Sequence, residues 1–417
     1  MKLNDIAEFV TDKISSGSIS LENYVTTDSL LQNKRGRETA QNLPPMQCAL
    51  TNYKQGDVLV ANIRPYLKKV WFADSEGGCS SDVLVFRAKN GHCPSFLYTV
   101  LMQDAFFDYA MSGAKGSKMP RGDKDQIMRY ELPTFTYTEE ENIGNMIVDI
   151  MSKINVNRQI NDNLEAMAKQ LYDYWFVQFD FPNEEGKPYK SNGGFMVWNE
   201  DLHMSIPCTW NTCLLSDYIG SNNTGDWGFD EPAKKRSIKV GCIRGADIVK
   251  LNDLPIRYIK DNNTSKLLSA WDIVIEVSGG SPTQATGRSA FVTPGVLKRN
   301  GGNLTCSNFC HAFTMKDYKA SAYFYFMWRM FYDNNNMFNF EGKTSGIKNF
   351  MTDTFLANKW LDIPTALLDL FFERVKVIYE QIDNNIEEIN ALTKQRDELL
   401  PLLMNGQATV NYHLSAC

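Results

Sequence analysis

Hydrophobic positions near the N-terminus follow the pattern of short strands. Alternating or β-branched runs at 57–63, 69–72 and 83–86 are separated by Gly, Pro and Asn. Such runs predict the strands of a mixed domain, and a longer apolar stretch at 95–111 predicts one helix. A second block with the same character extends from about residue 198 to residue 361.

After each block the hydrophobic period changes to three or four residues, which is typical of an amphipathic helix. The first helical pattern covers 139–178 and the second covers 363–405. About 33 residues of helix would be roughly 50 Å long. Between the first helix and the second block, residues 179–197 contain Pro182, Pro188 and three glycines, which predicts a linker.

We predict that the two long helices pack on each other antiparallel, because a globular block lies between them. The result would be a rod with a globular domain at each end. Asn157 and Asn385 on the seam would fix the register of the helices, or they would lie at its edge and face water. The predicted seam residues are Ile150, Ile154, Asn157, Leu164, Leu171, Val375, Ile378, Ile382, Asn385, Ile389 and Leu392.

Recurring sequence indicates that the chain is an internal duplication. Four matching pairs occur in the same order: GDVLVA at 56–61 and WDIVIE at 271–276, SGAKGSK at 112–118 and EGKTSGI at 341–347, LPT at 132–134 and IPT at 363–365, QINDNLEAM at 159–167 and QIDNNIEEI at 381–389. A duplicated unit gives a monomer an approximate two-fold axis. We therefore expect the protein to recognise a two-part object.

Composition sets the broad class of the protein. At 417 residues, with 43% hydrophobic residues, the chain is long enough for two to four globular domains. The N-terminal MKLNDIAEFV is charged, and no apolar run approaches the roughly 18 residues of a membrane span. We expect a cytoplasmic protein without membrane contact, and the nine cysteines, which lack paired spacing, fit reduced thiols.

Catalytic and metal motifs are missing from the sequence. It lacks the GxxxxGK[ST], GxGxxG, HExxH and GxSxG patterns. The segment NLPPM at 42–46 departs from the N-P-P-aromatic motif of amino-methyltransferases, because it has an extra Leu and ends in Met. Cys306, Cys310 and His311 resemble half of a zinc site without a second half at suitable spacing. We expect no metal, no cofactor and no catalysis by the chain alone.

Polar and basic loops recur at matching places in the two blocks. The net charge of −6 argues against non-specific coating of nucleic acid, but Arg, Asn and Gln suit base edges and Lys, Ser and Thr suit phosphates. Each cluster alone could be a solvated face, whereas recurrence favours DNA contacts. The candidates are Lys34, Arg35, Arg37, Arg64, Lys68, Lys69, Lys115, Lys118 and Arg121, then Lys234, Lys235, Arg236, Thr283, Gln284, Thr286, Arg288, Lys343, Lys348 and Asn349.

Over nearly its whole length the chain resembles the specificity (S) subunits of type I restriction-modification systems. The segments that carry the resemblance are YVTTDSLLQNKRG from Tyr24, GDVLVANIRPYLKKVWFAD from Gly56, NRQINDNLEAMAKQLYDYWFVQFDFP from Asn157, EGKTSGIKNF from Glu341 and LTKQRDELLPLLMNGQ from Leu392. The resemblance implies an α+β fold with two mixed α/β target recognition domains, separated by two long antiparallel helices that form a coiled-coil rod. The implied parts are recognition domain 1 (1–138), a central spacer helix (139–178), a linker (179–197), recognition domain 2 (198–362), a C-terminal spacer helix (363–405) and a tail (406–417).

The resemblance also implies a function and partners. Each recognition domain would bind one half of a bipartite, asymmetric double-stranded DNA site. From the chemistry of the loop residues we predict that Arg64 and Lys69 act on one half and Gln284 and Arg288 on the other. The helices would dock two methyltransferase subunits, and restriction subunits would join them. The alternative is a standalone bipartite DNA-binding or scaffold protein without methyltransferase partners.

Overall fold

The computed structural model describes residues 1–279, 281, 283–344 and 347–410, except the side chains of residues 343 and 344. The chain divides into two compact units. Unit 1 combines Met1–Val156 with the chain from Ile389 onward, and unit 2 is Asn157–Glu388. The two long helices, α5 (Tyr137–Tyr172) and α9 (Thr365–Met404), therefore each contribute residues to both units.

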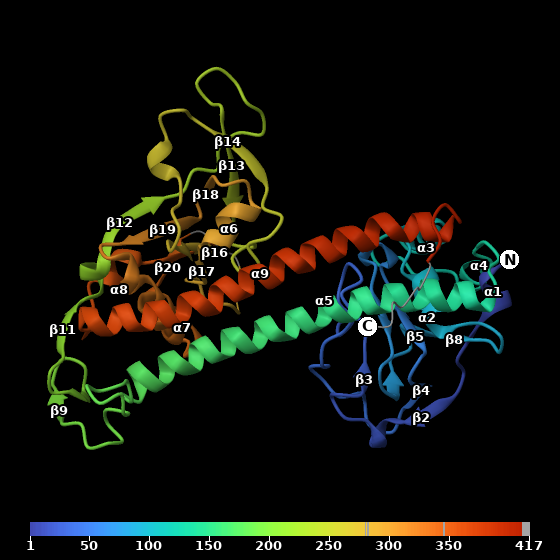
Figure 1. The fold of residues 1–417 in the computed structure, drawn as a ribbon, viewed down its shortest axis with the longest axis horizontal. Helices are drawn as coiled ribbons and strands as arrows, with labels where there is room; N and C mark the ends of the chain where they lie inside the picture. Colours follow the sequence, from blue (N-terminus) through green and yellow to red (C-terminus); the bar gives the residue numbers. More distant parts are fainter. Residues whose placement is uncertain (280, 282, 345–346, 411–417) are drawn as a thin grey trace, which may run out of the picture. The chain divides into compact units, whose positions relative to one another are not determined.

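Unit 1 contains two four-stranded sheets (Figure 1). The first is antiparallel throughout and has the order β1 (Ala7–Phe9), β8 (Val83–Ala88), β5 (Val58–Ala61), β6 (Val70–Phe72). All residues of β5 are buried, as expected for a strand covered on both faces. The second sheet has the order β2 (Lys13–Ser15), β4 (Ala49–Tyr53), β7 (Gly77–Cys79), β3 (Tyr24–Val25), and its β3–β7 pair is parallel.

Helices cover the first sheet of unit 1. Phe96, Leu97 and Val100 of α2 belong to the same buried cluster as Val58 and Val60 of β5. The prediction of one helix at 95–111 is wrong, because the extended backbone of Gln103 separates two helices. The helical elements of this part are α1 (Leu3–Ile6), η1 (Ser16–Ser18), η2 (Pro65–Leu67), α2 (Pro94–Leu101), α3 (Asp104–Ser112) and α4 (Lys124–Ile127).

Unit 2 has a four-stranded sheet with the same pattern as the first sheet of unit 1. Its order is β12 (Ile219–Thr224), β19 (Cys310–Met315), β15 (Ile273–Glu276), β17 (Ser289–Phe291), again antiparallel throughout. Two three-stranded sheets have the orders β14 (Ile256–Ile259), β13 (Ile238–Ile243), β18 (Leu304–Cys306) and β16 (Ser278–Gly279), β21 (Ile347–Phe350), β20 (Glu341–Thr344). Two-stranded sheets pair β9 (Met196–Asn199) with β10 (Met204–Pro207), and β11 (Asn211–Leu214) with β22 (Lys359–Asp362).

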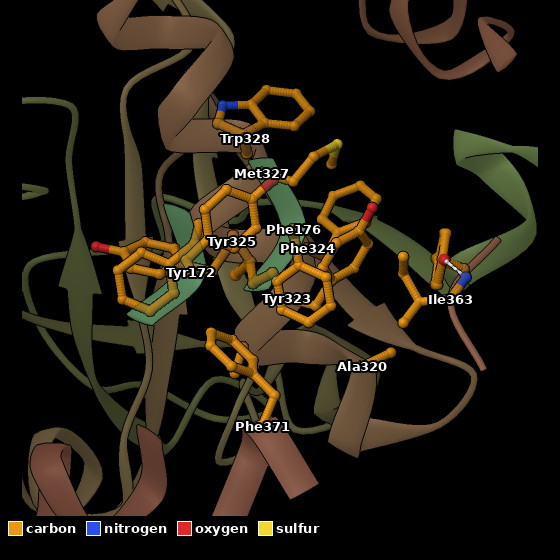
Figure 2. Packing of buried hydrophobic residues seen from close by; sticks show 14 of the residues in the cluster. Tyr172, Phe176, Ala320, Tyr323, Phe324, Tyr325, Met327, Trp328, Ile363 and Phe371 are labelled. Atoms are coloured by element: carbon orange, nitrogen blue, oxygen red, sulfur yellow. Dashed lines mark hydrogen bonds between the residues drawn. The ribbon is translucent and has the colours of Figure 1, made fainter. Parts of the chain in front are cut away.

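Aromatic side chains fill the main core of unit 2. Phe176 of η3 (Asp173–Val177), which directly follows α5, packs edge-on against Phe371 of α9 at a centroid distance of 5.0 Å, and against Tyr323 of α7 at 4.8 Å. Figure 2 shows these rings with Trp328 in one cluster. The helical elements of this part are η3 (Asp173–Val177), η4 (Leu215–Tyr218), η5 (Thr264–Lys266), α6 (Pro294–Arg299), η6 (Tyr318–Ala320), α7 (Ser321–Asp333), η7 (Asn336–Phe340) and α8 (Thr352–Leu356).

The segment 179–197, predicted to be a linker, contributes to this core. Phe179 and Phe181 are buried, and their rings lie 5.6 and 5.0 Å from that of Trp210. Asp180 accepts hydrogen bonds from the backbone N–H and the hydroxyl of Ser191. These contacts hold the segment in one conformation although it has little regular structure.

Within unit 2 the long helices run antiparallel. The amide of Asn157 donates to Glu388 at 2.8 Å, and that of Asn385 donates to Asn161 at 2.8 Å. Asn157 and Asn385 are both buried, so neither faces water. In unit 1 the α5 residues Ile150 and Ile154 share a cluster with Ile389 and Leu392 of α9, whereas Leu164, Leu171, Val375, Ile378 and Ile382 belong to the unit 2 core.

Candidate nucleic-acid interface

A shared turn precedes the central strand of the matching sheets. Gly56 before β5 and Trp271 before β15 both adopt positive φ, 89° and 74°. The N–H of Gly56 donates to the carbonyl of Ala73 at 2.9 Å, and that of Trp271 donates to the carbonyl of Val292 at 2.6 Å. Positive φ is unusual for a tryptophan, so the turn is retained at a local conformational cost.

The next residue is a buried aspartate in both units. Asp57 accepts a hydrogen bond from the N–H of Lys54, and Asp272 accepts one from the N–H of Ser269. Burial raises the pKa of Asp272, although its hydrogen bonds oppose the shift. The pair GDVLVA and WDIVIE thus corresponds to one turn, one carboxylate and one strand in each unit.

The two units share another local feature that the sequence analysis did not identify. The carboxylate of Asp5 accepts the N–H of Lys2, and the carboxylate of Asp217 accepts the N–H of Leu214, at the start of α1 and η4 respectively. Each short helix leads directly into the edge strand of its sheet, β1 or β12. The signal was the spacing Leu-x-Asp at 3–5 and 215–217, which is too short to stand out without the structure.

Each unit joins two loops that are far apart in the sequence. In unit 1 the loop after β5, residues 62–69, lies against residues 113–122, because Arg64 N–H donates to the Pro120 carbonyl at 2.8 Å and Ile63 bridges to Arg121. We call these segments loop pair 1. In unit 2 the loop after β15, of which residues 277–279, 281 and 283–288 are described, pairs with residues 341–344 and 347–350 through β16 and β21, where Ser278 lies opposite Asn349. We call these segments loop pair 2.

The loop pairs unite most of the candidate DNA-binding residues. Residues 31–37 lie next to loop pair 1, because the N–H of Asn33 donates to the Leu67 carbonyl and the N–H of Lys34 donates to the Lys68 carbonyl. In loop pair 2 the ammonium of Lys348 lies 3.5 Å from the carbonyl of Gln284, and Glu341 contacts both Thr286 and Lys348. Thr283, Arg288 and Asn349 belong to the same segments, and the side chain of Lys343 lies outside the described residues. The cluster Lys234, Lys235 and Arg236 lies elsewhere in unit 2, before β13.

Several candidate cations of unit 1 have internal partners. Lys34 is buried and pairs with Asp104 at 2.7 Å, and Lys68 pairs with the same carboxylate at 2.9 Å. Burial lowers the pKa of Lys34 despite this pairing. Lys69 donates to the carbonyl of Thr27, and burial also lowers its pKa. These lysines stabilise the loops and are poorly placed to meet a ligand.

Other cations of loop pair 1 are open to solvent. Lys115 pairs with Asp123 at 3.2 Å and Arg121 pairs with Asp82 at 3.1 Å, and both cations are largely exposed. Exposed pairs of this kind are weak and can be exchanged for phosphate contacts. In the part of the chain that the structure describes, the exposed side chain of Lys118 makes no ion pair or hydrogen bond.

The three remaining arginines near loop pair 1 make no ion pairs among the described residues. The guanidinium of Arg37 stacks on the ring of Trp71 at 4.4 Å and donates to the carbonyl of Glu22. Arg64 adopts positive φ of 53°, and its buried Nε finds no acceptor in the described chain. Arg35 is half-buried. All three can present guanidinium nitrogens to an acceptor outside the protein.

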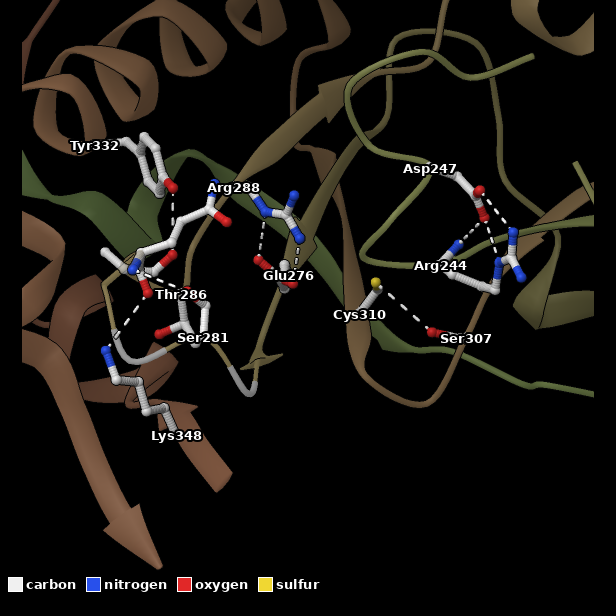
Figure 3. Close-up of polar contacts among 12 residues, drawn as sticks. Arg244, Asp247, Glu276, Ser281, Thr286, Arg288, Ser307, Cys310, Tyr332 and Lys348 are labelled. Carbon is white, nitrogen blue, oxygen red and sulfur yellow. Dashed lines mark hydrogen bonds and ion pairs between the residues drawn. The ribbon is translucent and has the colours of Figure 1, made fainter. Parts of the chain in front are cut away.

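Loop pair 2 is built on ion pairs (Figure 3). Arg288 donates two hydrogen bonds to the buried carboxylate of Glu276, at 2.7 and 2.6 Å, and these bonds raise the pKa of Arg288. Glu341 accepts from the backbone and hydroxyl of the buried Thr286 and pairs with Lys348 at 3.0 Å. The exposed polar residues at the surface of the loop pair are Thr283, Gln284 and Asn349.

Cys306 and Cys310, whose spacing resembles half of a zinc site, are two buried thiols. Burial raises the pKa of Cys310 to about 12, and the Cys306 thiol contacts the Cys310 carbonyl at 3.6 Å. Among the described residues, no three His, Cys, Asp or Glu side chains are grouped so that they could hold a metal ion. None of the helices in the described chain is both long and apolar enough to span a bilayer.

Comparison with known proteins finds relatives among the specificity subunits of type I restriction enzymes. It is 24% identical over 388 residues to the type I restriction enzyme MjaIX specificity subunit of Methanocaldococcus jannaschii, which covers 90% of this chain and 83% of that protein. The chain resembles type I specificity subunits. A second relative, the HindI specificity subunit of Haemophilus influenzae, is 25% identical over 185 residues, covering 43% of this chain and 40% of its own length. No family model matches the chain.

The fold agrees with this relationship. The crystal structure of the type I S subunit from M. genitalium matches 97% of this chain and 95% of its own chain, with a TM-score of 0.53 and 14% identity. At this identity the likeness concerns the fold alone. The resemblance to specificity subunits that the sequence motifs indicated is thus confirmed, as is the mixed α and β content of the fold.

Proposed function

We propose that this chain is the DNA-recognition subunit of a type I restriction-modification complex, in which each loop pair binds one half of a bipartite DNA site. The observation that supports the proposal most strongly is the recurrence of one arrangement. The same sheet, the same turn and a joined pair of loops after the central strand occur in unit 1 and in unit 2. A duplicated surface suits a ligand with two related halves.

The chemistry of the loop pairs suits different base sequences. Loop pair 1 exposes Lys115, Lys118 and Arg121, whereas loop pair 2 exposes Thr283, Gln284 and Asn349. Arginine favours guanine edges, and amides favour adenine edges. The proposed half-sites therefore differ, in agreement with an asymmetric target.

The long helices are the proposed docking sites for two methyltransferase subunits, which restriction subunits would join. In unit 2, α5 exposes Ile160 and Met167, and α9 exposes Leu370 and Val377. Each pair is seven residues apart and therefore lies on one face of its helix. Exposed apolar residues on one face are common at protein–protein contacts. The chain itself would contribute no catalytic group, since its sequence lacks methyltransferase and nuclease motifs.

The test is co-expression with a type I methyltransferase subunit from the same genome, followed by native mass spectrometry and sequencing of methylated DNA. We expect two methyltransferase copies per chain and methylation of one bipartite sequence. Exchange of Arg121 for Gln should relax recognition of one half-site only, and the matched exchange of the exposed Arg129, outside the loop pairs, should leave both halves unchanged. Methyl transfer by the chain alone, or a complex with one methyltransferase copy, would contradict the proposal.

A further inference from the structure

A basic surface in unit 2 lies apart from loop pair 2. Residues 232–243 contain Lys234, Lys235, Arg236 and Lys239 and no acidic residue, although the chain as a whole has a net charge of −6. We call the surface formed by Lys234, Lys235, Lys239 and Lys260 the basic face. All four lysines are exposed.

Strand register places these lysines together. β13 and β14 pair antiparallel, with Lys239 opposite Tyr258 and Ile238 opposite Ile259. Side chains alternate along a strand, so Lys260 and Lys239 point to the face opposite the buried Ile259. The N–H of Asp261 donates to the carbonyl of Lys235 at 3.1 Å, which brings the turn at 234–236 beside the end of β14.

The basic face keeps its positive charge. Within the described chain, its lysine side chains make no ion pair or hydrogen bond. The neighbouring carboxylate of Asp261 accepts hydrogen bonds from the N–H and hydroxyl of Ser237, at 2.7 and 2.8 Å, and Asp230 pairs with Arg257. Asp261 and the exposed Glu231 are the nearby carboxylates in sequence that form no ion pair within the described chain, so the four lysines still leave an excess of positive charge.

This surface and loop pair 2 stand on different sheets of unit 2. The lysines lie on the β14–β13–β18 sheet, whereas loop pair 2 contains the β16–β21–β20 sheet. Figure 1 shows β13 and β14 farther from α9 than β16 and β20 are. We therefore treat the basic face as a surface separate from that of Gln284 and Asn349.

We propose that the basic face binds the phosphate backbone of duplex DNA beside the half-site that loop pair 2 recognises. This inference rests on the proposed function and adds a contact that carries no base preference. Lysine is a flexible point charge, which suits phosphates and gives little discrimination between bases. The contact would raise affinity for any duplex and position unit 2 on the DNA.

The experiment exchanges Lys234, Lys235, Lys239 and Lys260 for Gln in the full chain, assembled with its methyltransferase subunits. A control variant carries Gln at Lys54, Lys124, Lys190 and Lys316, which are also exposed and change the net charge equally. Fluorescence anisotropy measures binding to the methylated target sequence and to a scrambled duplex of equal length. The salt concentration is varied over roughly 50–200 mM, because affinity that depends on phosphate contacts changes strongly in this range.

We expect the basic-face variant to lose about tenfold or more in affinity for both duplexes, by the same factor. The slope of log affinity against log salt should become shallower by up to about 3.6, since each phosphate contact contributes about 0.9. The control variant should retain the wild-type slope, and the methylated sequence should be unchanged in both.

Three outcomes would overturn the inference. An unchanged salt slope would show that the lysines do not meet phosphates, and a loss confined to the target duplex would show that they recognise bases. Loss of the methyltransferase subunits in native mass spectrometry would show that the basic face binds an acidic protein surface. If the wild-type complex fails to distinguish the two duplexes, the proposed function fails, while the scrambled duplex still tests the basic face.

Discussion

Arg288 illustrates how neighbouring residues decide the role of one side chain. The sequence marks it as a base-contacting arginine, and the structure shows both its hydrogen bonds going to the buried Glu276. Removing one member of a buried pair leaves an uncompensated charge. The two roles predict different outcomes for the same substitution.

We expect Arg288→Ala to lower the free energy of unfolding by about 3 kcal/mol, because Glu276 loses its partner. Adding Glu276→Gln should recover most of the loss by removing the charge. Arg244→Ala is the control, because Arg244 forms the same kind of bidentate pair, with Asp247, but is more exposed, so its loss should cost no more than about 1 kcal/mol. Urea unfolding measures all three. If Arg288→Ala left the stability unchanged but relaxed recognition of one half-site, Arg288 would instead be assigned to base recognition.

Asp104 links the stability of unit 1 to pH. Burial opposes its ionisation, but hydrogen bonds and ion pairs from Lys34 and Lys68 outweigh burial and lower the pKa of Asp104. A carboxylate with a lowered folded-state pKa stabilises the fold fully above its unfolded pKa of about 3.9, and this contribution disappears as the pH falls through the folded pKa.

Wild-type protein should therefore be more stable than Asp104→Asn at pH 7, and the difference should shrink towards pH 3. Denaturant midpoints at the two pH values measure this. Asp108→Asn changes an exposed residue on the same helix and should show no such dependence. A difference between wild type and Asp104→Asn that is equal at both pH values would mean that the ion pairs contribute nothing.

At the scale of the elements, close contact between helices decides whether glycine is tolerated or required. Gly144 lies inside α5, where alanine would ordinarily add up to about 1 kcal/mol of helix stability. A Cβ at this position would come within 2.5 Å of the backbone nitrogen of Phe96 and 2.6 Å of the carbonyl carbon of Ser95. Both are backbone atoms of α2, which cannot move aside without disturbing the sheet beneath.

Gly144→Ala should consequently destabilise unit 1 by about 1–3 kcal/mol, the usual cost of overpacking. Ser152→Ala, at an exposed position of the same helix, should be neutral or slightly stabilising. Thermal unfolding of both variants compares them directly. A stabilised Gly144→Ala variant would mean that α5 and α2 are not in contact as described.

At the scale of the whole molecule, the proposed function makes the long helices a spacer between the two half-sites. Insertion of four residues beside Asn161 in α5, with four beside Asn385 in α9, would lengthen both helices by roughly 6 Å. DNA rises about 3.4 Å per base pair, so the unread gap should grow by one or two base pairs. Methylome sequencing reads the result. An active variant with an unchanged gap would show that the helices do not set the spacing.

Local patterns in the sequence were sufficient for the long helices and for one turn and strand that occur in both units. A helix with a regular apolar stripe is specified by residues three and four positions apart, so 139–178 and 363–405 are close to the observed α5 and α9. The motif GDVLVA and its counterpart likewise mark one local turn and one strand. The sequence pattern did not predict the break between α2 and α3, because a single residue with extended backbone, Gln103, causes it.

Only the tertiary structure decided which polar residues remain available to a partner. Lys34 meets Asp104, and Thr286 meets Glu341, across long stretches of sequence that no local pattern connects. Ion pairs depend on distances of a few ångströms, whereas a sequence records only that a charge is present. The sequence could therefore identify the candidate cations, but only the fold shows that Lys34 is buried and that Lys118 is exposed.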